Sequence, residues 1–155
     1  MRQVWLEGLN TRVKTFDVFR LPYSNASKKH IDELYPGRVR FFEGTSVQTV
    51  PRYVSEIRAG REPLCDVWFV DGDHSHGVPL IDMQNAIKSA AIGATIIVDD
   101  CTERFPDVLQ AWRATLQTGV IADAFNHTLT LPPPAGLKGW CVGRYAPNSQ
   151  HIEQG

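Results

Sequence analysis

Two short apolar runs on either side of a helix-like stretch limit most strongly how this chain can fold. Asp66–Val70 and Ala94–Val98 are apolar at nearly every position, so both faces of each strand are expected to be buried. Between them, apolar residues recur at helical spacing from Leu80 to Ala90, and Gly93 is expected to end that helix. A strand, a helix and a second strand in this order predict two adjacent parallel strands.

The remainder of the chain repeats this alternation. Further strands are predicted at Val13–Phe19, Val39–Phe42, Thr128–Leu131 and Gly139–Tyr145, and further helices at Asn25–Tyr35, Val50–Ala59 and Pro106–Leu116. The opening segment, residues 1–10, resembles the end of a helix. Strands that alternate with helices predict an α/β fold with a mainly parallel sheet and flanking helices. We expect one domain over residues 1–145 and a polar tail over residues 146–155.

Composition places the chain among ordinary globular proteins and argues against two classes of partner. Hydrophobic residues make up 43% of the chain and charged residues 21%. The net charge of -1 offers no basic surface, so neither nucleic acid nor a membrane is expected as a partner. No apolar run approaches the roughly 20 residues that span a bilayer. The opening segment lacks the apolar core of a secretory signal, so a cytoplasmic location is expected.

The three cysteines, Cys65, Cys101 and Cys141, are widely spaced, and none belongs to a CxxC pair. A zinc ribbon or a thioredoxin-like site is therefore not indicated. Each cysteine lies in or beside an apolar strand-like run, so buried and reduced thiols are expected.

Acidic and small polar residues gather at the carboxyl ends of the predicted strands. They are Asp17 on the first strand, Gly44, Thr45 and Ser46 after the second, Asp71–His74 after the third, and Asp99 and Asp100 after the fourth. Ligands of open parallel sheets bind at this edge. Core packing gives no reason for carboxylates there, because an unpaired buried carboxylate is costly. Since Mg²⁺ and similar cations prefer oxygen ligands, the two acidic strand ends predict a metal site.

Each motif also has a purely local interpretation. Asp17 can begin a turn, and Gly44–Ser46 can be an ordinary connection between a strand and a helix. The loop Asp71–His76 can cap the helix that follows, because Asp and Ser are favoured at helix N-termini. Asp99–Asp100 can be loop residues, and a loop histidine such as His76 is usually solvated. The order of residues does not match the HExxH pattern of metalloproteases.

Two longer strings resemble a known family. CDVWFVDGDHSHGVPLIDMQNAI followed by GATIIVDD resembles the fourth and fifth strands of class I S-adenosylmethionine-dependent methyltransferases, in their small-molecule O-methyltransferase branch. VKTFDVF resembles the second strand of that family, VRFFEGTS the third and GWCVGRY the last. The resemblance covers about Thr11 to Tyr145. It implies an incomplete, Rossmann-like methyltransferase fold.

The resemblance also implies roles for individual residues. Asp17 would bind the ribose of S-adenosylmethionine, Gly44, Thr45 and Ser46 would lie near its adenine, and Asp71 and Gly72 would complete the cofactor site. Mg²⁺ or another divalent cation would be held by Asp71, Asp99 and Asp100, and the catalytic residues would be His74, as a base, and Asp71. The chain departs from the family at Thr45, where an acid is common, and at His76, where Tyr is usual. Before Asp17 there is no G-x-G-x-G turn and no first strand.

The leading expectation is transfer of a methyl group to the hydroxyl of a small-molecule substrate, with metal assistance. A non-catalytic remnant or binding module of the same fold is the second reading, which the missing glycine-rich turn favours. A metal-dependent hydrolase or hydroxylase-like protein that uses the same acidic edge is the third. Without a first strand, neighbouring strands would have unpaired backbone groups, so a homo-oligomer or a partner subunit that completes the sheet is expected.

Overall fold

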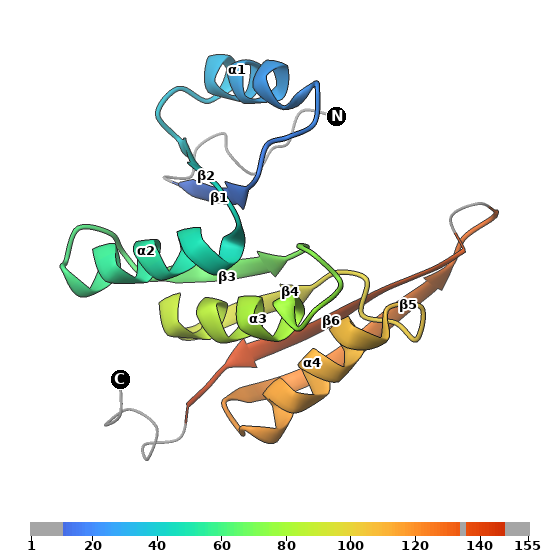
Figure 1. Cartoon of the computed structure of the whole chain (residues 1–155). Coiled ribbons are helices and arrows are strands. Elements are labelled where there is room, and N and C mark those ends of the chain that lie inside the picture. Colours follow the sequence, from blue (N-terminus) through green and yellow to red (C-terminus); the bar gives the residue numbers. More distant parts are fainter. Residues whose placement is uncertain (1–10, 134–135, 148–155) are drawn as a thin grey trace. The chain divides into compact units, whose positions relative to one another are not determined.

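The computed structural model describes residues 11–133 and 136–147, which divide into two compact units between Thr49 and Val50. Figure 1 shows their helices and strands. The helix predicted in residues 1–10 lies outside the described residues, as does most of the predicted polar tail. No described helix is long and apolar enough to cross a membrane.

The first unit is built on two parallel strands joined by a helix. Strand β1 (Val13–Asp17) pairs with β2 (Val39–Glu43), and α1 (Ser24–Leu34) connects them. Phe16 and Phe42 lie side by side in this pairing, with stacked rings whose centroids are 4.7 Å apart. The register also places Asp17 beside Glu43, so both strands end at the same edge.

The second unit contains a four-stranded sheet in the order β3-β4-β6-β5. Its elements are α2 (Ser46–Arg58, which begins in the first unit), β3 (Cys65–Val70), α3 (Val78–Ser89), β4 (Ala90–Val98), α4 (Pro106–Gln117), β5 (Ile121–Thr130) and β6 (Leu137–Tyr145). Strands β3 and β4 are adjacent and parallel, as predicted, whereas β6 runs antiparallel between β4 and β5. The predicted α/β class is therefore confirmed.

Helices α3 and α4 pack on one face of this sheet. Their side chains Met83 and Trp112 are at most 1% exposed and join Ile96, Val98 and Cys141 in the main core cluster. Trp68 and Val70 of β3 pack against the same cluster. This arrangement buries alternate residues in the second half of β4 and along most of β6, whereas most of β5 is exposed.

The opposite face of the sheet is open, so the prediction that both faces of β3 are buried is wrong. Val67 and Phe69 are 60% and 54% exposed, because they alternate with the side chains that meet the helices. Phe69 also begins a register row that continues through Ile97 and Val142 to Phe125, which is 57% exposed. Among the described strands β3 pairs only with β4, so it is an edge strand.

The predicted boundary between helix and strand near Gly93 is also wrong. Helix α3 ends at Ser89, and β4 begins directly at Ala90. Gly93 lies within β4 at a φ of 86°, in the region that favours glycine. The pairing of β3 with β4 shifts register between Cys65 and Val67, opposite this part of β4, as at a β-bulge.

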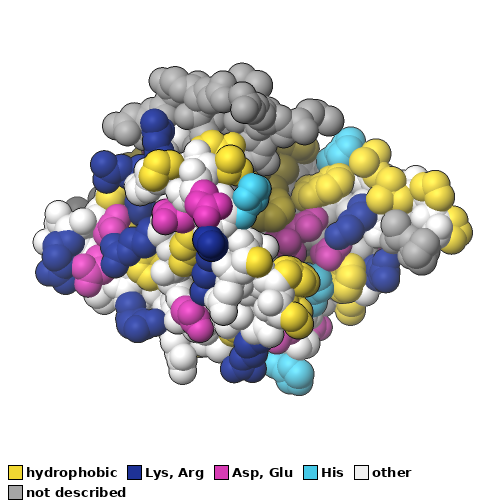
Figure 2. All heavy atoms as spheres, turned by 90° about the horizontal axis from the view of Figure 1, so that it is seen from above, with side chains coloured by type: hydrophobic (Ala, Val, Ile, Leu, Met, Phe, Trp, Pro, Cys, Tyr) yellow, Lys and Arg dark blue, Asp and Glu magenta, His cyan; other side chains and the backbone are white. Residues whose placement is uncertain are grey.

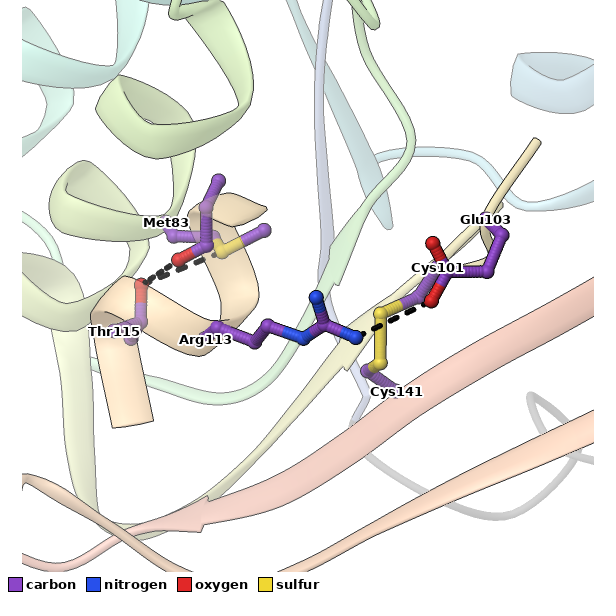
Figure 3. The surroundings of a disulfide bond; sticks show 7 residues. Met83, Cys101, Glu103, Arg113, Thr115 and Cys141 are labelled. Atoms are coloured by element: carbon purple, nitrogen blue, oxygen red, sulfur yellow. Dashed lines mark hydrogen bonds and ion pairs between the residues drawn. A yellow bond between two sulfur atoms is a disulfide. The ribbon is translucent and has the colours of Figure 1, made fainter. Parts of the chain in front are cut away.

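The expectation of three reduced thiols is wrong for two of them. Cys101 and Cys141 form a disulfide across 40 residues, with Cα atoms 5.6 Å apart, whereas Cys65 forms no disulfide. Cys101 follows β4 and its backbone N–H donates to Gly139 on β6, which brings the two cysteines within bonding reach. Figure 3 shows the disulfide near Arg113, which extends from α4 to Glu103.

Candidate cofactor and metal site

In the turn that follows β4, Asp100 is directed toward the interior of the second unit. The backbone N–H of Asp99 donates to the carbonyl of Val70 at 2.9 Å, which continues the pairing of β3 with β4. Asp100 adopts a φ of 53°, an uncommon conformation for a residue with a side chain, and is only 7% exposed. Its carbonyl accepts the N–H of Thr102 at 2.8 Å. The hydrogen bonds of this turn therefore fix both acidic residues at the carboxyl end of β4.

The loop after β3 is shaped by its own side chains. One carboxylate oxygen of Asp73 accepts from the backbone N–H of Ser75 at 2.9 Å and from its hydroxyl at 2.7 Å. These hydrogen bonds lower the pKa of Asp73. The same hydroxyl lies 2.7 Å from Nδ1 of His76, which is exposed and adopts a φ of 57°. Asp73 and His76 thus serve the local turn, but no side chain caps α3, whose N-cap residue is Gly77, so the predicted helix cap is wrong.

Three other groups converge between the two strand ends. One possible ligand atom from each of Asp71, His74 and Asp100 lies within 4.8 Å of the others. Nε2 of His74 lies 3.6 Å from a carboxylate oxygen of Asp100, so the predicted proximity of the two acidic segments is confirmed. Nε2 of His74 and one oxygen of Asp99 are buried without a hydrogen-bond partner. These donor atoms fit a divalent cation, which typically lies about 2.0–2.6 Å from each oxygen ligand.

A lysine that the sequence analysis missed completes the cluster. Nζ of Lys138, on β6, donates to a carboxylate oxygen of Asp100 at 2.7 Å and lies 3.8 Å from one of Asp99. The hydrogen bond to Asp100 raises the pKa of Lys138. The pKa of Asp71 is also raised, first by partial burial of its carboxyl group and then by the negative charges of Asp99 and Asp100.

Two further contacts near the cluster were missed. The ring of Phe105 lies 4.5 Å from that of His74, centroid to centroid, and packs against it. Asp82, on α3, lines a small pocket together with Asp71, Gly72 and Asp99. A Cβ atom at Gly72 would lie 2.8 Å from a carboxylate oxygen of Asp82. Asp82 lies within the predicted helix from Leu80 to Ala90, and its position among the apolar residues of that helix does not mark it as part of the pocket wall.

The predicted cofactor residues of the first unit also lie together. The N–H of Gly44 donates to the carbonyl of Asp17 at 3.0 Å. A carboxylate oxygen of Asp17 accepts the N–H of Phe19 at 3.3 Å, which matches the local interpretation of a turn. The carbonyl of Thr45 accepts the N–H of Thr49 in the first turn of α2, which begins at Ser46. Asp17, Gly44 and Thr45 thus share one edge of the β1–β2 pair.

Comparison with known families decides the assignment. A family model described as a methyltransferase domain matches residues 3–101, which are 99 of the 155 residues. The chain belongs to this methyltransferase-domain family. The match includes both acidic strand ends of the cluster and the β1–β2 edge. A search of curated protein sequences finds no match to the chain.

Solved structures show the same Rossmann-like methyltransferase fold. TomG, an O-methyltransferase from Streptomyces achromogenes crystallised with SAM, gives a TM-score of 0.64 at 17% identity, over 88% of this chain and 62% of that one. Cofactor-bound Rv0187 from MTB gives 0.62 at 21% identity, again over 88% and 62%. The Bacillus cereus O-methyltransferase in complex with SAH gives 0.56 at 18% identity, over 86% and 62%. This methyltransferase-domain chain therefore spans about 62% of the length of these structures.

Proposed function

We propose that this chain carries most of an S-adenosylmethionine-dependent methyltransferase that methylates the hydroxyl of a small molecule. The observation that carries the proposal is the convergence of Asp71, His74 and Asp100 at the carboxyl ends of β3 and β4. Membership of the methyltransferase-domain family supports the methyl donor. The solved O-methyltransferases of the same fold support a hydroxyl as the acceptor.

The acceptor hydroxyl would be activated by the acidic cluster. A divalent cation such as Mg²⁺, held by Asp71, Asp99 and Asp100, would supply a Lewis acid that lowers the pKa of the hydroxyl. His74 would take the proton, because its Nε2 is buried, has no hydrogen-bond partner and lies 3.6 Å from a carboxylate oxygen of Asp100. As the O–C bond forms, the C–S bond of the donor breaks. Alignment of the oxygen with the methyl group would contribute much of the rate.

The β1–β2 edge would hold the nucleoside part of the cofactor. The exposed carboxylate of Asp17 would accept hydrogen bonds from the ribose, and Gly44–Ser46 would border the adenine. Residues 1–16 contain no glycine-rich turn, so a polypeptide of these 155 residues alone would lack, at the methionine end, the backbone N–H donors that nucleotide-binding loops provide. We therefore expect weak binding by the isolated chain.

A partner that completes the sheet would restore that binding. Strand β3 pairs on only one side among the described residues, and its open face carries Val67 and Phe69. Both features support a second copy of the chain or a partner subunit that adds a strand there. Nucleic acid and membrane partners find no support, since acidic and basic side chains are intermixed over the face seen in Figure 2.

Calorimetric titration of S-adenosylmethionine tests the proposal. Loss of several hydrogen bonds, each contributing about 1.5–3 kcal/mol, weakens binding by roughly two to four orders of magnitude. We expect a dissociation constant well above the low micromolar range, and further weakening in Asp17→Ala. Glu33→Ala, an exposed acid on α1, is the matched control and should bind as the wild type does. An unchanged affinity in Asp17→Ala would reject the nucleoside site.

Undetectable binding of the cofactor would favour the second candidate, a non-catalytic binding module of the same fold. Residues 1–16 contain no glycine-rich turn, and a module that binds another ligand would not require one. Metal-dependent hydrolysis is the third, supported by a cluster whose ligands need no methyl donor. Hydrolysis of ester or phosphoester substrates by a chain that does not bind S-adenosylmethionine would support it.

We also propose a cytoplasmic location for the chain. A cytoplasmic location agrees with the reduced thiol of Cys65, whereas the disulfide between Cys101 and Cys141 weighs against it, because disulfides are rare in the cytosol. Alkylation of thiols in freshly lysed cells distinguishes the two cases. One reactive thiol per chain indicates an oxidising compartment, and three indicate a reducing one.

A further inference from the structure

Lys138 lies beside Asp99 and Asp100, the acidic turn after β4, where a positive charge offsets the repulsion between the two carboxylates. Its Nζ atom is 2.7 Å from Asp100 and 3.8 Å from Asp99. The side chains of these two acids are only 10% and 14% exposed, so water screens them poorly. Two neighbouring carboxylates in such a place repel each other unless a cation lies between them. The ammonium group of Lys138 already provides that cation.

The same carboxylate serves two different cation positions. One oxygen of Asp100 accepts from Lys138, and the other faces Nε2 of His74 within the cluster that can hold a metal ion. A divalent ion bound by Asp71, Asp99 and Asp100 would therefore lie close to the ammonium group. The two positive charges would repel each other and would share the negative charge of Asp100.

The backbone holds Lys138 in this position. Val98 pairs with Cys141 in the antiparallel ladder between β4 and β6, so the residues before Cys141 run alongside the turn after Val98. The hydrogen bond from Cys101 to the carbonyl of Gly139, the residue after Lys138, extends this contact beyond the ladder. The placement of the ammonium group therefore follows from the pairing of the two strands.

We propose that Lys138 is a built-in counter-ion of the acidic turn and sets how tightly Asp71, Asp99 and Asp100 bind a divalent cation. The inference rests on the metal-assisted reaction proposed above. Lys138 is here a positioning residue that holds Asp99 and Asp100 in the absence of metal and competes with the metal for Asp100. The wild-type chain would then bind divalent cations weakly, and loss of the ammonium charge would strengthen that binding.

Direct measurement of Mn²⁺ binding tests the inference, with the signal of free Mn²⁺ followed by electron paramagnetic resonance at a fixed pH. We expect Lys138→Met to bind Mn²⁺ at least tenfold more tightly than the wild type. Lys138→Gln, which keeps a hydrogen-bond donor for Asp100, should do the same and provides a second variant if the methionine variant does not fold. Lys138→Arg keeps the charge and should match the wild type. Lys88→Met removes an exposed lysine of α3 and controls for net charge.

Equal or weaker Mn²⁺ binding by the folded Lys138→Met and Lys138→Gln variants would overturn the inference, as would a tenfold gain in Lys88→Met. In the Lys138→Met background, Asp71→Ala should abolish the gain, which assigns the bound ion to this cluster. Titration of S-adenosylmethionine into the same variants separates the two proposals. Unchanged cofactor affinity with unchanged Mn²⁺ affinity would reject the role of Lys138 and leave the methyl-transfer proposal standing.

Discussion

Removal of the disulfide should destabilise the second unit by an amount that its position along the chain predicts. Cys101 and Cys141 are 40 residues apart and both are almost fully buried. On the chain-entropy account, a cross-link that closes a loop of this length stabilises the folded state by about 4 kcal/mol at 25 °C. For a chain of this size, each kcal/mol shifts Tm by about 2–4 °C. The double variant Cys101→Ser/Cys141→Ser should therefore unfold roughly 8–16 °C below the wild type.

Thermal unfolding followed by far-ultraviolet circular dichroism measures this shift under oxidising conditions. The wild type in the presence of a reductant should move toward the double variant. Cys65→Ser leaves the disulfide intact and serves as the control, with a much smaller change expected. A double variant that unfolds within about 2 °C of the oxidised wild type would refute the argument, because a closed loop of this length cannot then restrict the unfolded chain.

Three further predictions concern single residues. Gly72→Ala places a Cβ atom 2.8 Å from a carboxylate oxygen of Asp82 and should lower the free energy of unfolding by about 1–3 kcal/mol in a urea titration; an unchanged midpoint would contradict the contact. Trp112→Ala empties the centre of the core, where Trp112 is 1% exposed, and should lower that free energy by about 3–5 kcal/mol, measured in the same way. The raised pKa of Asp71 means that the folded chain binds its proton more tightly than the unfolded chain does, so this group lowers stability as pH rises above the unfolded value of about 4. Asp71→Asn should therefore raise stability at pH 7, by less than about 1 kcal/mol because the residue is partly exposed, and should not raise it near pH 3.

The sequence predicts well those features that depend on neighbouring residues. The apolar runs around Trp68 and Ile96 locate β3 and β4, and the acids that follow each run locate the cluster. The end of α3 was predicted wrongly at Gly93, because glycine favours both the ends of helices and bulges within strands. Strand β5 was predicted only near its end, because polar residues such as Asn126 and His127 interrupt the alternation on this exposed strand.

Features that depend on pairing between distant segments could not be predicted from the sequence. The disulfide and the contact of Lys138 with Asp100 both require the antiparallel register of β4 with β6. A single sequence does not specify that register, since any later strand is an equally good candidate for the neighbour of β4. The exposure of Phe69 was missed for a related reason. A run that is apolar on both faces shows what a strand is suited to contact, and the described residues cover only one of those faces.

The open apolar row across the sheet, from Phe69 through Ile97 and Val142 to Phe125, has a consequence for the behaviour of the chain during synthesis. A nascent chain that has formed β3 and β4 presents an unprotected edge and a hydrophobic face to other nascent chains, and such surfaces template aggregation. On the proposal that another chain adds a strand to β3, the yield of soluble protein would be a kinetic quantity, set by whether that strand pairs with β3 before nascent chains aggregate. Co-expression with a chain that adds a strand to β3 would then increase the yield of soluble protein without any change in the fold itself.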